Sequence, residues 1–244
     1  HIPTFIHESD MTPGLANKIS IPFATKVCCN FPETVSQLPE DKAVLTGTPI
    51  RQELLEGNPE KALEFTGLSK DKPVILIIGG SLGAAAVNDA VRKILPELLK
   101  DFQVIHLCGK DKVDETLTNV KGYVQYEYIK QELADLFALA DLVISRAGAN
   151  AICELSALNK PNLLIPLSAR ASRGDQILNA RSFEQLGYSK VLEEEELTND
   201  ILLSAVRDLY ENREAYITAM SSSKHKDSIQ QIVQLFEDAV NKTL

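Results

Sequence analysis

A glycine-rich turn after an apolar run is the first candidate for chemistry. The run Val74-Ile75-Leu76-Ile77-Ile78 is typical of a strand buried on both faces, and it leads through Gly79-Gly80-Ser81-Leu82-Gly83-Ala84 into a helical pattern. Glycines at such a junction let the backbone approach a ligand closely, and the helix amino terminus offers free N–H groups to a phosphate. The spacing matches neither the dinucleotide-binding fingerprint nor the phosphate-binding loop that ends in Gly-Lys-Ser/Thr. Taken alone, the turn fits either a phosphate site or a glycine turn without a ligand.

A second turn of small residues crosses from a predicted strand into a helix and carries a carboxylate. In Ser145-Arg146-Ala147-Gly148-Ala149-Asn150-Ala151-Ile152-Cys153-Glu154, the small residues around Gly148 expose another helix amino terminus. Glu154 lies one helical turn after Asn150, so both share a face that looks toward the carboxyl edge of the sheet. A carboxylate there can accept two hydrogen bonds from a ribose diol. The alternative is a surface charge or a partner of the helix cap.

A third polar cluster, Ser172-Arg173-Gly174-Asp175-Gln176-Ile177-Leu178-Asn179-Ala180, follows the strand predicted at 162–166. Amides and carboxylates at a loop-to-helix junction suit sugar hydroxyls, which need both donors and acceptors. Asp175 by itself is equally well explained as a helix cap. Because the three loops follow strands of one predicted sheet, we expect them to converge on the crevice where such sheets bind ligands.

The elements that must position these loops alternate between strand and helix. Strands are predicted at 74–78, 103–107, 123–126, 142–145, 162–166 and 189–192, with helices at about 84–99, 130–139, 149–158, 175–186 and 198–210. Six strands separated by helices predict a doubly wound parallel sheet from about residue 70 to about residue 222. The acidic run Glu193–Glu196 is interpreted as a solvated turn.

The first sixty residues contain three short predicted strands, at 3–7, 26–29 and 43–45, with a helix after Pro13. Three strands fit either a small subdomain packed on the main one or the tail of a second α/β domain whose beginning is absent, and we favour the second interpretation. The polar stretch Glu56–Asp71 is typical of a linker with one short helix.

Composition limits the class of function. With 25 Lys and Arg against 34 Asp and Glu, the net charge is -9, which argues against nucleic-acid binding. No apolar run approaches the roughly 20 residues that cross a bilayer, although contact with a membrane surface stays open. Cys28, Cys29, Cys108 and Cys153 show no metal-ligand spacing and are expected to be buried thiols.

The combination of motifs resembles the MurG family of glycosyltransferases, which move N-acetylglucosamine (GlcNAc) from UDP-GlcNAc onto a lipid-linked muramyl-pentapeptide in peptidoglycan synthesis. Besides the three loops, the resemblance includes His7-Glu8-Ser9-Asp10, Pro13-Gly14-Leu15-Ala16-Asn17-Lys18 and Gly47-Thr48-Pro49-Ile50-Arg51, and it spans essentially the whole chain. It implies an inverting, metal-independent enzyme without a cofactor, built from two Rossmann-like domains of the GT-B type. Residues 1–60 would be the remnant of the acceptor-side domain, 61–71 a linker, 72–224 the UDP-GlcNAc-binding domain and 225–244 a helix packing back toward the first domain.

The resemblance also implies roles for particular residues. Ser81, Leu82 and Gly83 would meet the diphosphate, and Ile129 would present backbone groups to uracil. Ala149, Asn150 and Ala151 would supply a helix amino terminus, Glu154 the ribose contacts and Gln176 the GlcNAc hydroxyls. Arg51 would reach in from the amino-terminal side. Asp10, a substrate-binding candidate, stands where relatives often have Asn.

Catalysis needs a base for the acceptor hydroxyl and stabilisation of the departing UDP. His7 and Glu8 are the local candidates for the base, beside a histidine that the family carries in an amino-terminal glycine-rich loop, and no such loop occurs here. We therefore expect an inactive fragment of a peripheral enzyme at the cytoplasmic face of the bacterial plasma membrane, with most membrane contacts in the absent part. The alternatives are another UDP-sugar transferase, a UDP-GlcNAc epimerase or a non-catalytic nucleotide-binding module.

Overall fold

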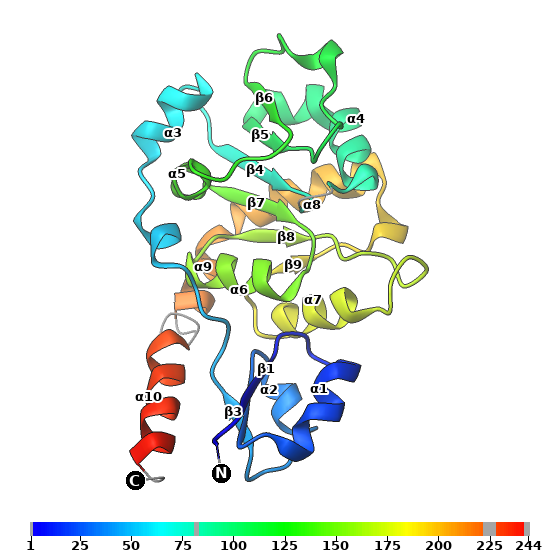
Figure 1. The fold of residues 1–244 in the computed structure, drawn as a ribbon. Coiled ribbons are helices and arrows are strands. Elements are labelled where there is room, and N and C mark those ends of the chain that lie inside the picture. Colours follow the sequence, from blue (N-terminus) through cyan, green and yellow to red (C-terminus); the bar gives the residue numbers. More distant parts are fainter. Residues whose placement is uncertain (1, 81–82, 222–227, 242–244) are drawn as a thin grey trace.

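In the computed structural model, which describes residues 2–80, 83–221 and 228–241, the chain forms two parallel β-sheets joined by an extended segment (Figure 1). The small sheet has the strand order β1-β2-β3 and the large one the order β6-β5-β4-β7-β8-β9. The strand direction and the six-stranded sheet confirm the predicted α/β class. No helix in the described ranges is long and apolar enough to cross a membrane.

The large sheet follows the pattern of a doubly wound fold. Its strands are β4 (Val74–Ile78), β5 (Gln103–Leu107), β6 (Tyr123–Tyr126), β7 (Leu142–Ser145), β8 (Asn162–Leu164) and β9 (Lys190–Val191). The chain first moves outward from β4 to β6 and then returns to the other side of β4 with β7. In folds of this kind, the point of reversal marks the crevice in which ligands bind, which is here expected beyond the carboxyl ends of β4 and β7.

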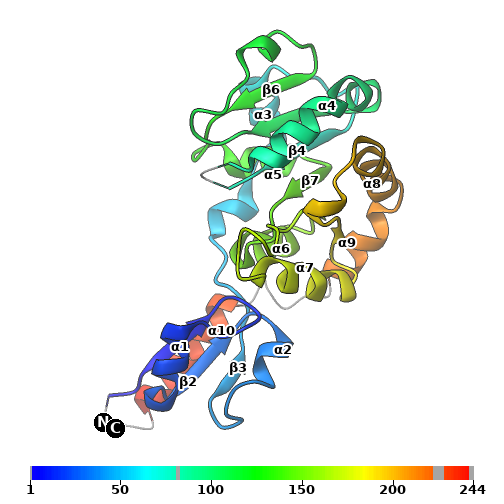
Figure 2. The ribbon, with the colours of Figure 1, turned by 90° about the vertical axis from the view of Figure 1, so that its right-hand side faces the viewer.

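Helices cover both faces of the large sheet (Figure 2). They are α3 (Pro59–Thr66), α4 (Ala85–Asp101), α5 (Leu133–Leu139), α6 (Ala149–Ala157), α7 (Asp175–Gln185), α8 (Asn199–Glu211) and α9 (Arg213–Ser221). Successive residues of β4 enter different cores, because side chains alternate across a strand. Leu76 packs in the cluster that contains α5 and α6, whereas Ile75 and Ile77 pack in the cluster that contains α4 and α8. Burial on both faces explains why the sequence of this strand is uniformly apolar.

The small sheet consists of β1 (Phe5–Glu8), β2 (Lys26–Cys29) and β3 (Ala43–Leu45), accompanied by α1 (Leu15–Ser20) and α2 (Pro32–Val35). The last helix, α10 (Ser228–Asn241), runs beside this sheet in both views, and the ring of its Phe236 lies 4.4 Å from that of Phe5. The small sheet is also fastened to the large domain. Phe31 packs edge-on against Phe183 of α7, with 5.8 Å between ring centroids.

The elements expected from the sequence are present, with shifts at their ends. Helix α4 continues to Asp101, beyond the predicted end at 99, and Pro96 lies inside it. Helix α5 begins at Leu133 rather than near 130, and β8 ends at Leu164, two residues before Pro166. Such shifts at element ends arise because periodicity weakens there and tertiary contacts decide the boundary.

Candidate functional site

Two of the three predicted loops meet where the strand order of the large sheet reverses. Strands β4 and β7 are neighbours with Ile78 opposite Ser145, so the turns that follow them leave the sheet side by side. In doubly wound sheets this reversal is the usual position of a ligand. The glycine turn and the small-residue turn therefore share one crevice.

The glycine turn is held tightly against the end of β5. Gly80 and Gly83 have φ values of 84° and 69°, which glycine adopts without steric cost. A Cβ atom on Gly83 would lie 2.0 Å from the carbonyl oxygen of Cys108, so a side chain cannot fit there without moving the backbone. Ser81 and Leu82, predicted to meet a diphosphate, lie outside the described residues. Gly83 is therefore required for close backbone packing, whereas Gly80 has open space and is favoured by its positive φ.

The second turn exposes the amino terminus of α6. Gly148 is the N-cap residue, makes no side-chain capping bond, and has nothing within 4 Å of the position that a Cβ would take. The first N–H groups of a helix have no partner within it, and the helix dipole makes this end positive. Ala149, Asn150 and Ala151 therefore present N–H groups and positive potential to the crevice, as an anion requires.

Glu154 follows on the next turn of α6 and faces Arg51, which lies far away in the sequence. The Glu154 Oε1 atom is 3.8 Å from Arg51 Nη2, and the two side chains are 25% and 58% exposed. Burial raises the pKa of the Glu154 carboxyl, while the Arg51 guanidinium lowers it in part. A pair this long and this exposed is weak. The carboxylate is therefore available to a ligand that offers better donors.

Gln176 lies in the first turn of α7, and one end of its amide is already engaged. Its Oε1 accepts a hydrogen bond of 3.0 Å from the backbone N–H of Leu167. This contact fixes the orientation of the amide and leaves the NH₂ group as a donor.

The side chain of Ile129 is buried in the core, so the role predicted for this residue rests on its backbone groups.

Glu8 ends β1 and is buried, with 4% of its surface exposed. Its carboxylate accepts hydrogen bonds from the backbone N–H groups of Asp10 and Gly14, at 3.1 and 2.8 Å, and from the Asn17 amide at 2.9 Å. These hydrogen bonds hold the loop between β1 and α1 closed. The geometry gives Glu8 a structural task in addition to the role predicted for it.

His7 is the second base candidate, and its tautomer follows from its partner. The Nε2 atom lies 3.0 Å from the carbonyl oxygen of Gly47. Because a carbonyl can only accept, Nε2 carries the hydrogen and Nδ1 is the basic nitrogen of the neutral ring.

Asn179 of α7 connects the loop after β1 in the small domain to the turn after β7. Fully buried, it donates through Nδ2 to Asp10 Oδ1 at 3.0 Å and to the Ala147 carbonyl at 3.4 Å. Its Oδ1 accepts from the Met11 N–H at 3.0 Å. Asp10 is thereby held beside the small-residue turn. Asn179 belongs to the third polar cluster of the sequence, but no role was predicted for it, because its partners on the small domain are distant in the sequence.

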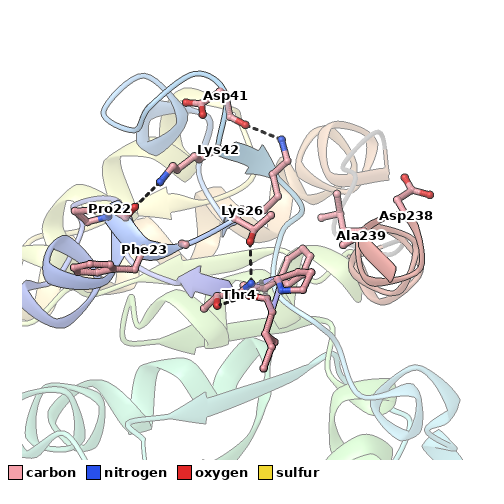
Figure 3. Close-up of a pocket in the computed structure, with 14 residues that line it drawn as sticks. Thr4, Pro22, Phe23, Lys26, Asp41, Lys42, Asp238 and Ala239 are labelled. Atoms are coloured by element: carbon pink, nitrogen blue, oxygen red, sulfur yellow. Dashed lines mark hydrogen bonds between the residues drawn. The ribbon is translucent and has the colours of Figure 1, made fainter. Parts of the chain in front are cut away.

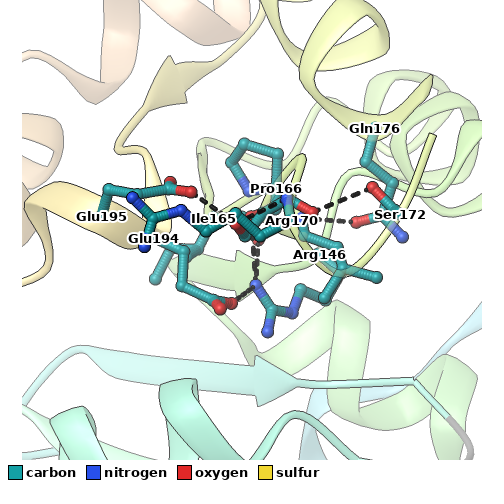
Figure 4. A network of polar contacts seen from close by, with 10 residues as sticks. Arg146, Ile165, Pro166, Arg170, Ser172, Gln176, Glu194 and Glu195 are labelled. Atoms are coloured by element: carbon teal, nitrogen blue, oxygen red, sulfur yellow. Dashed lines mark hydrogen bonds and ion pairs between the residues drawn. The ribbon is translucent and has the colours of Figure 1, made fainter. Parts of the chain in front are cut away.

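Arg146 is a second residue without a predicted role, and it connects the acidic turn after β9 to the end of β8 (Figure 4). Its guanidinium forms an ion pair with Glu194 and donates to the carbonyl oxygens of Ile165 and Pro166, both at 3.1 Å. The interpretation of Glu193–Glu196 as a solvated turn is therefore wrong for Glu194. An arginine at the end of a buried strand signals that an acidic partner is needed, but it does not identify which one.

A separate groove of about 1040 Å³ lies at the opposite edge of the small sheet (Figure 3). It is lined by the amino-terminal ends of β1 and β2, residues 22–25 and α10, with side chains that include Phe5, Phe23, Lys26 and Leu235. It contains none of the three loops. Because ligands of α/β sheets bind at carboxyl ends of strands, we place the candidate site in the crevice instead.

The described residues contain no group of three or more His, Cys, Asp or Glu side chains arranged to hold a metal ion.

The fold is an α/β arrangement of the GT-B type. Residues 74–234 match the glycosyltransferase family 28 C-terminal domain. The glycosyltransferase of kitacinnamycin shares the fold, with a TM-score of 0.69 at 18% identity over 89% of this chain and 55% of that one.

More similar relatives narrow the class. The chain is 65% identical over 238 residues to the UDP-N-acetylglucosamine–N-acetylmuramyl-(pentapeptide) pyrophosphoryl-undecaprenol N-acetylglucosamine transferase of Lachnospira eligens, and 64% identical over 237 residues to that of Lachnoclostridium phytofermentans. These matches cover 98% and 97% of this chain and 67% of each relative. The crystal structure of Acinetobacter baumannii MurG superimposes with a TM-score of 0.72 at 26% identity, covering 97% of this chain and 67% of that one. The chain belongs to the MurG family of N-acetylglucosaminyltransferases.

Proposed function

We propose that this chain is the donor-binding part of an enzyme that transfers GlcNAc from UDP-GlcNAc to undecaprenyl-pyrophosphate-linked N-acetylmuramyl-pentapeptide. One observation supports this most directly. The crevice between β4 and β7 joins a glycine turn, the free amino terminus of α6 and the carboxylate of Glu154, in a chain 65% identical to a transferase of that name.

Each part of the crevice suits one part of the donor. The glycine turn and the N–H groups of Ala149–Ala151 suit the diphosphate, because both offer positive potential to an anion. Glu154 suits the ribose diol, because an ionised carboxylate accepts from two hydroxyls. The NH₂ group of Gln176 suits a GlcNAc hydroxyl, and the backbone near Ile129 suits uracil.

The same groups suit the departure of UDP. Negative charge grows on the diphosphate as the bond to the anomeric carbon breaks, and preorganised donors stabilise this charge. The amino terminus of α6 is such a donor set. Arg51 can add a full positive charge, because its exposed guanidinium is held only by the long contact with Glu154.

For the base, the geometry favours His7 over Glu8. The Glu8 oxygens accept hydrogen bonds from three donors within its own loop, whereas His7 donates from Nε2 to the Gly47 carbonyl and keeps Nδ1 as an acceptor atom. The acceptor is lipid-linked, so we also propose that the enzyme acts at the cytoplasmic face of the plasma membrane as a peripheral protein.

The test compares donor binding with transfer. Calorimetry should show UDP and UDP-GlcNAc binding to the 244-residue chain. A fusion that adds the unmatched amino-terminal third of the Lachnospira eligens relative should transfer labelled GlcNAc from UDP-GlcNAc to the lipid-linked acceptor. Release of a 2-epimer without transfer would instead identify an epimerase, and binding without transfer by the fusion would favour a nucleotide-binding module.

A further inference from the structure

The acidic turn after β9 is fastened to three different parts of the large domain. Glu194–Glu196 form the short 3-10 helix η4. Glu193 pairs with Arg181 of α7 at 2.6 Å, Glu194 pairs with Arg146, and Glu195 accepts from the hydroxyl of Ser168. We call Glu193, Glu194 and Glu195 the acidic bracket. Glu196 is exposed, and its side chain forms no hydrogen bond or ion pair with any described residue.

Of the two ion pairs in the acidic bracket, the one between Arg146 and Glu194 is the less exposed. The Arg146 and Glu194 side chains are 13% and 22% exposed, compared with 46% and 32% for Arg181 and Glu193. A charge this shielded needs an opposite charge, whereas the more exposed pair contributes little. Arg146 also donates to the carbonyl oxygens of Ile165 and Pro166, directly after β8. By holding the Arg146 guanidinium, Glu194 therefore stabilises the start of the β8–α7 loop.

From that point a series of hydrogen bonds runs along the β8–α7 loop to the start of α7 (Figure 4). The Ser172 hydroxyl donates to the Ser168 carbonyl at 3.1 Å and accepts from the Gly174 N–H at 3.1 Å. Leu167, directly after Pro166, supplies the N–H that orients the Gln176 amide. The acidic bracket therefore holds the start of the β8–α7 loop through Arg146 and Ser168, and it holds α7, which carries Gln176, through Arg181.

We propose that the acidic bracket is a positioning device that sets the selectivity of the site for the sugar, and not its affinity for the nucleotide. The inference rests on the proposed function, in which Gln176 meets the GlcNAc hydroxyls. In the proposed function the nucleotide is bound by the glycine turn, the amino terminus of α6 and Glu154. Among the described residues, the acidic bracket reaches this side only through Arg146, which precedes Gly148, the N-cap of α6. Loosening the loop frees Gln176 from its fixed orientation, and a hydroxyl of the wrong configuration is then rejected less strongly.

The experiment compares Glu194→Ala with Glu196→Ala, which removes the same charge from the same turn. Dissociation constants of the 244-residue chain for UDP-GlcNAc, UDP-GalNAc and UDP are measured by calorimetry well below the unfolding temperature. For Glu194→Ala we expect the preference for UDP-GlcNAc over UDP-GalNAc to fall roughly threefold or more, with UDP affinity within about twofold of wild type. Glu196→Ala should leave all three constants unchanged.

Further variants separate the outcomes. Ser168→Ala removes the contact with Glu195 and the 3.1 Å hydrogen bond that the Ser168 hydroxyl accepts from the Arg170 N–H. It should reduce the same preference, and it replaces Glu194→Ala if that variant does not fold. Equal loss for all three ligands, or no difference between Glu194→Ala and Glu196→Ala, would overturn the positioning role. A wild-type chain that binds UDP but does not distinguish the two sugars would overturn the proposed function instead.

Discussion

Replacing Glu154 with Gln tests the ribose contact with little change in shape. The variant keeps the length of the side chain, removes the negative charge and leaves one acceptor oxygen. A hydrogen bond to a charged group contributes about 1.5–3 kcal/mol. Because the Glu154 side chain is 25% exposed, water can replace part of the lost interaction, and we expect the lower half of that range. A loss of about 1.5–2 kcal/mol corresponds to roughly 10- to 30-fold weaker UDP binding.

The stability of the chain should change little in Glu154→Gln, because its contact with Arg51 is long and exposed. Calorimetry with UDP and with pyrophosphate, which lacks the ribose, is the assay, and Glu211→Gln on an exposed position of α8 is the control. Pyrophosphate affinity should stay within about twofold of wild type, since it contacts only the phosphate-binding groups. An equal loss for both ligands, or no loss for UDP, would refute the ribose assignment.

The pH dependence gives an independent check on the same carboxylate. Its pKa is raised above the usual 4.5, mainly by burial. Ribose binding needs the ionised form, so UDP affinity should begin to fall on acidification at a higher pH than an ordinary glutamate would give. Glu154→Gln should lack this part of the profile.

Three further predictions concern selectivity and stability. Gln176→Ala should reduce the preference for UDP-GlcNAc over UDP-GalNAc while UDP affinity stays nearly intact, and tenfold weaker binding of UDP in calorimetry would contradict this role. Burial, with a smaller contribution from Arg92, lowers the pKa of His106 from 6.5 to about 3, so the folded state excludes a proton that the unfolded state binds. Urea unfolding should therefore show stability falling as pH drops below about 6.5, by on the order of 2 kcal/mol by pH 4.5, and His106→Gln should flatten this slope. Gly83→Ala should cost at least about 2 kcal/mol in the same assay, because its Cβ would strike a backbone carbonyl, whereas Gly148→Ala, with open space, should stay within about 0.5 kcal/mol. Equal stability of the two glycine variants would contradict the packing argument.

Much of the large domain was predictable from the sequence because its signals are local. Continuous apolar runs such as Val74–Ile78 mark strands that are buried on both faces, and the helical periodicity between them leaves a doubly wound sheet as the natural arrangement. Gly79–Gly83 and Gly148 mark turns into helices, which also locates two helix amino termini. Strand direction then brings these turns to one edge without knowledge of any side-chain contact.

The tertiary structure decided which charged groups are free and which are engaged. Glu8 and Glu154 are both glutamates near the ends of predicted elements, yet Glu8 is surrounded by three donors and Glu154 has a long contact with Arg51. Likewise, Glu194 is paired, whereas Glu196 has no side-chain partner among the residues that the structure describes, although both belong to one acidic run. The sheet, its turns and the edge at which they meet follow from the sequence, because they depend on local periodicity and backbone freedom. The partners of Asn179, Arg146 and Glu194 become visible only in the folded chain. A hydrogen bond or ion pair depends on distances between segments far apart in the sequence, and periodicity carries no information about them.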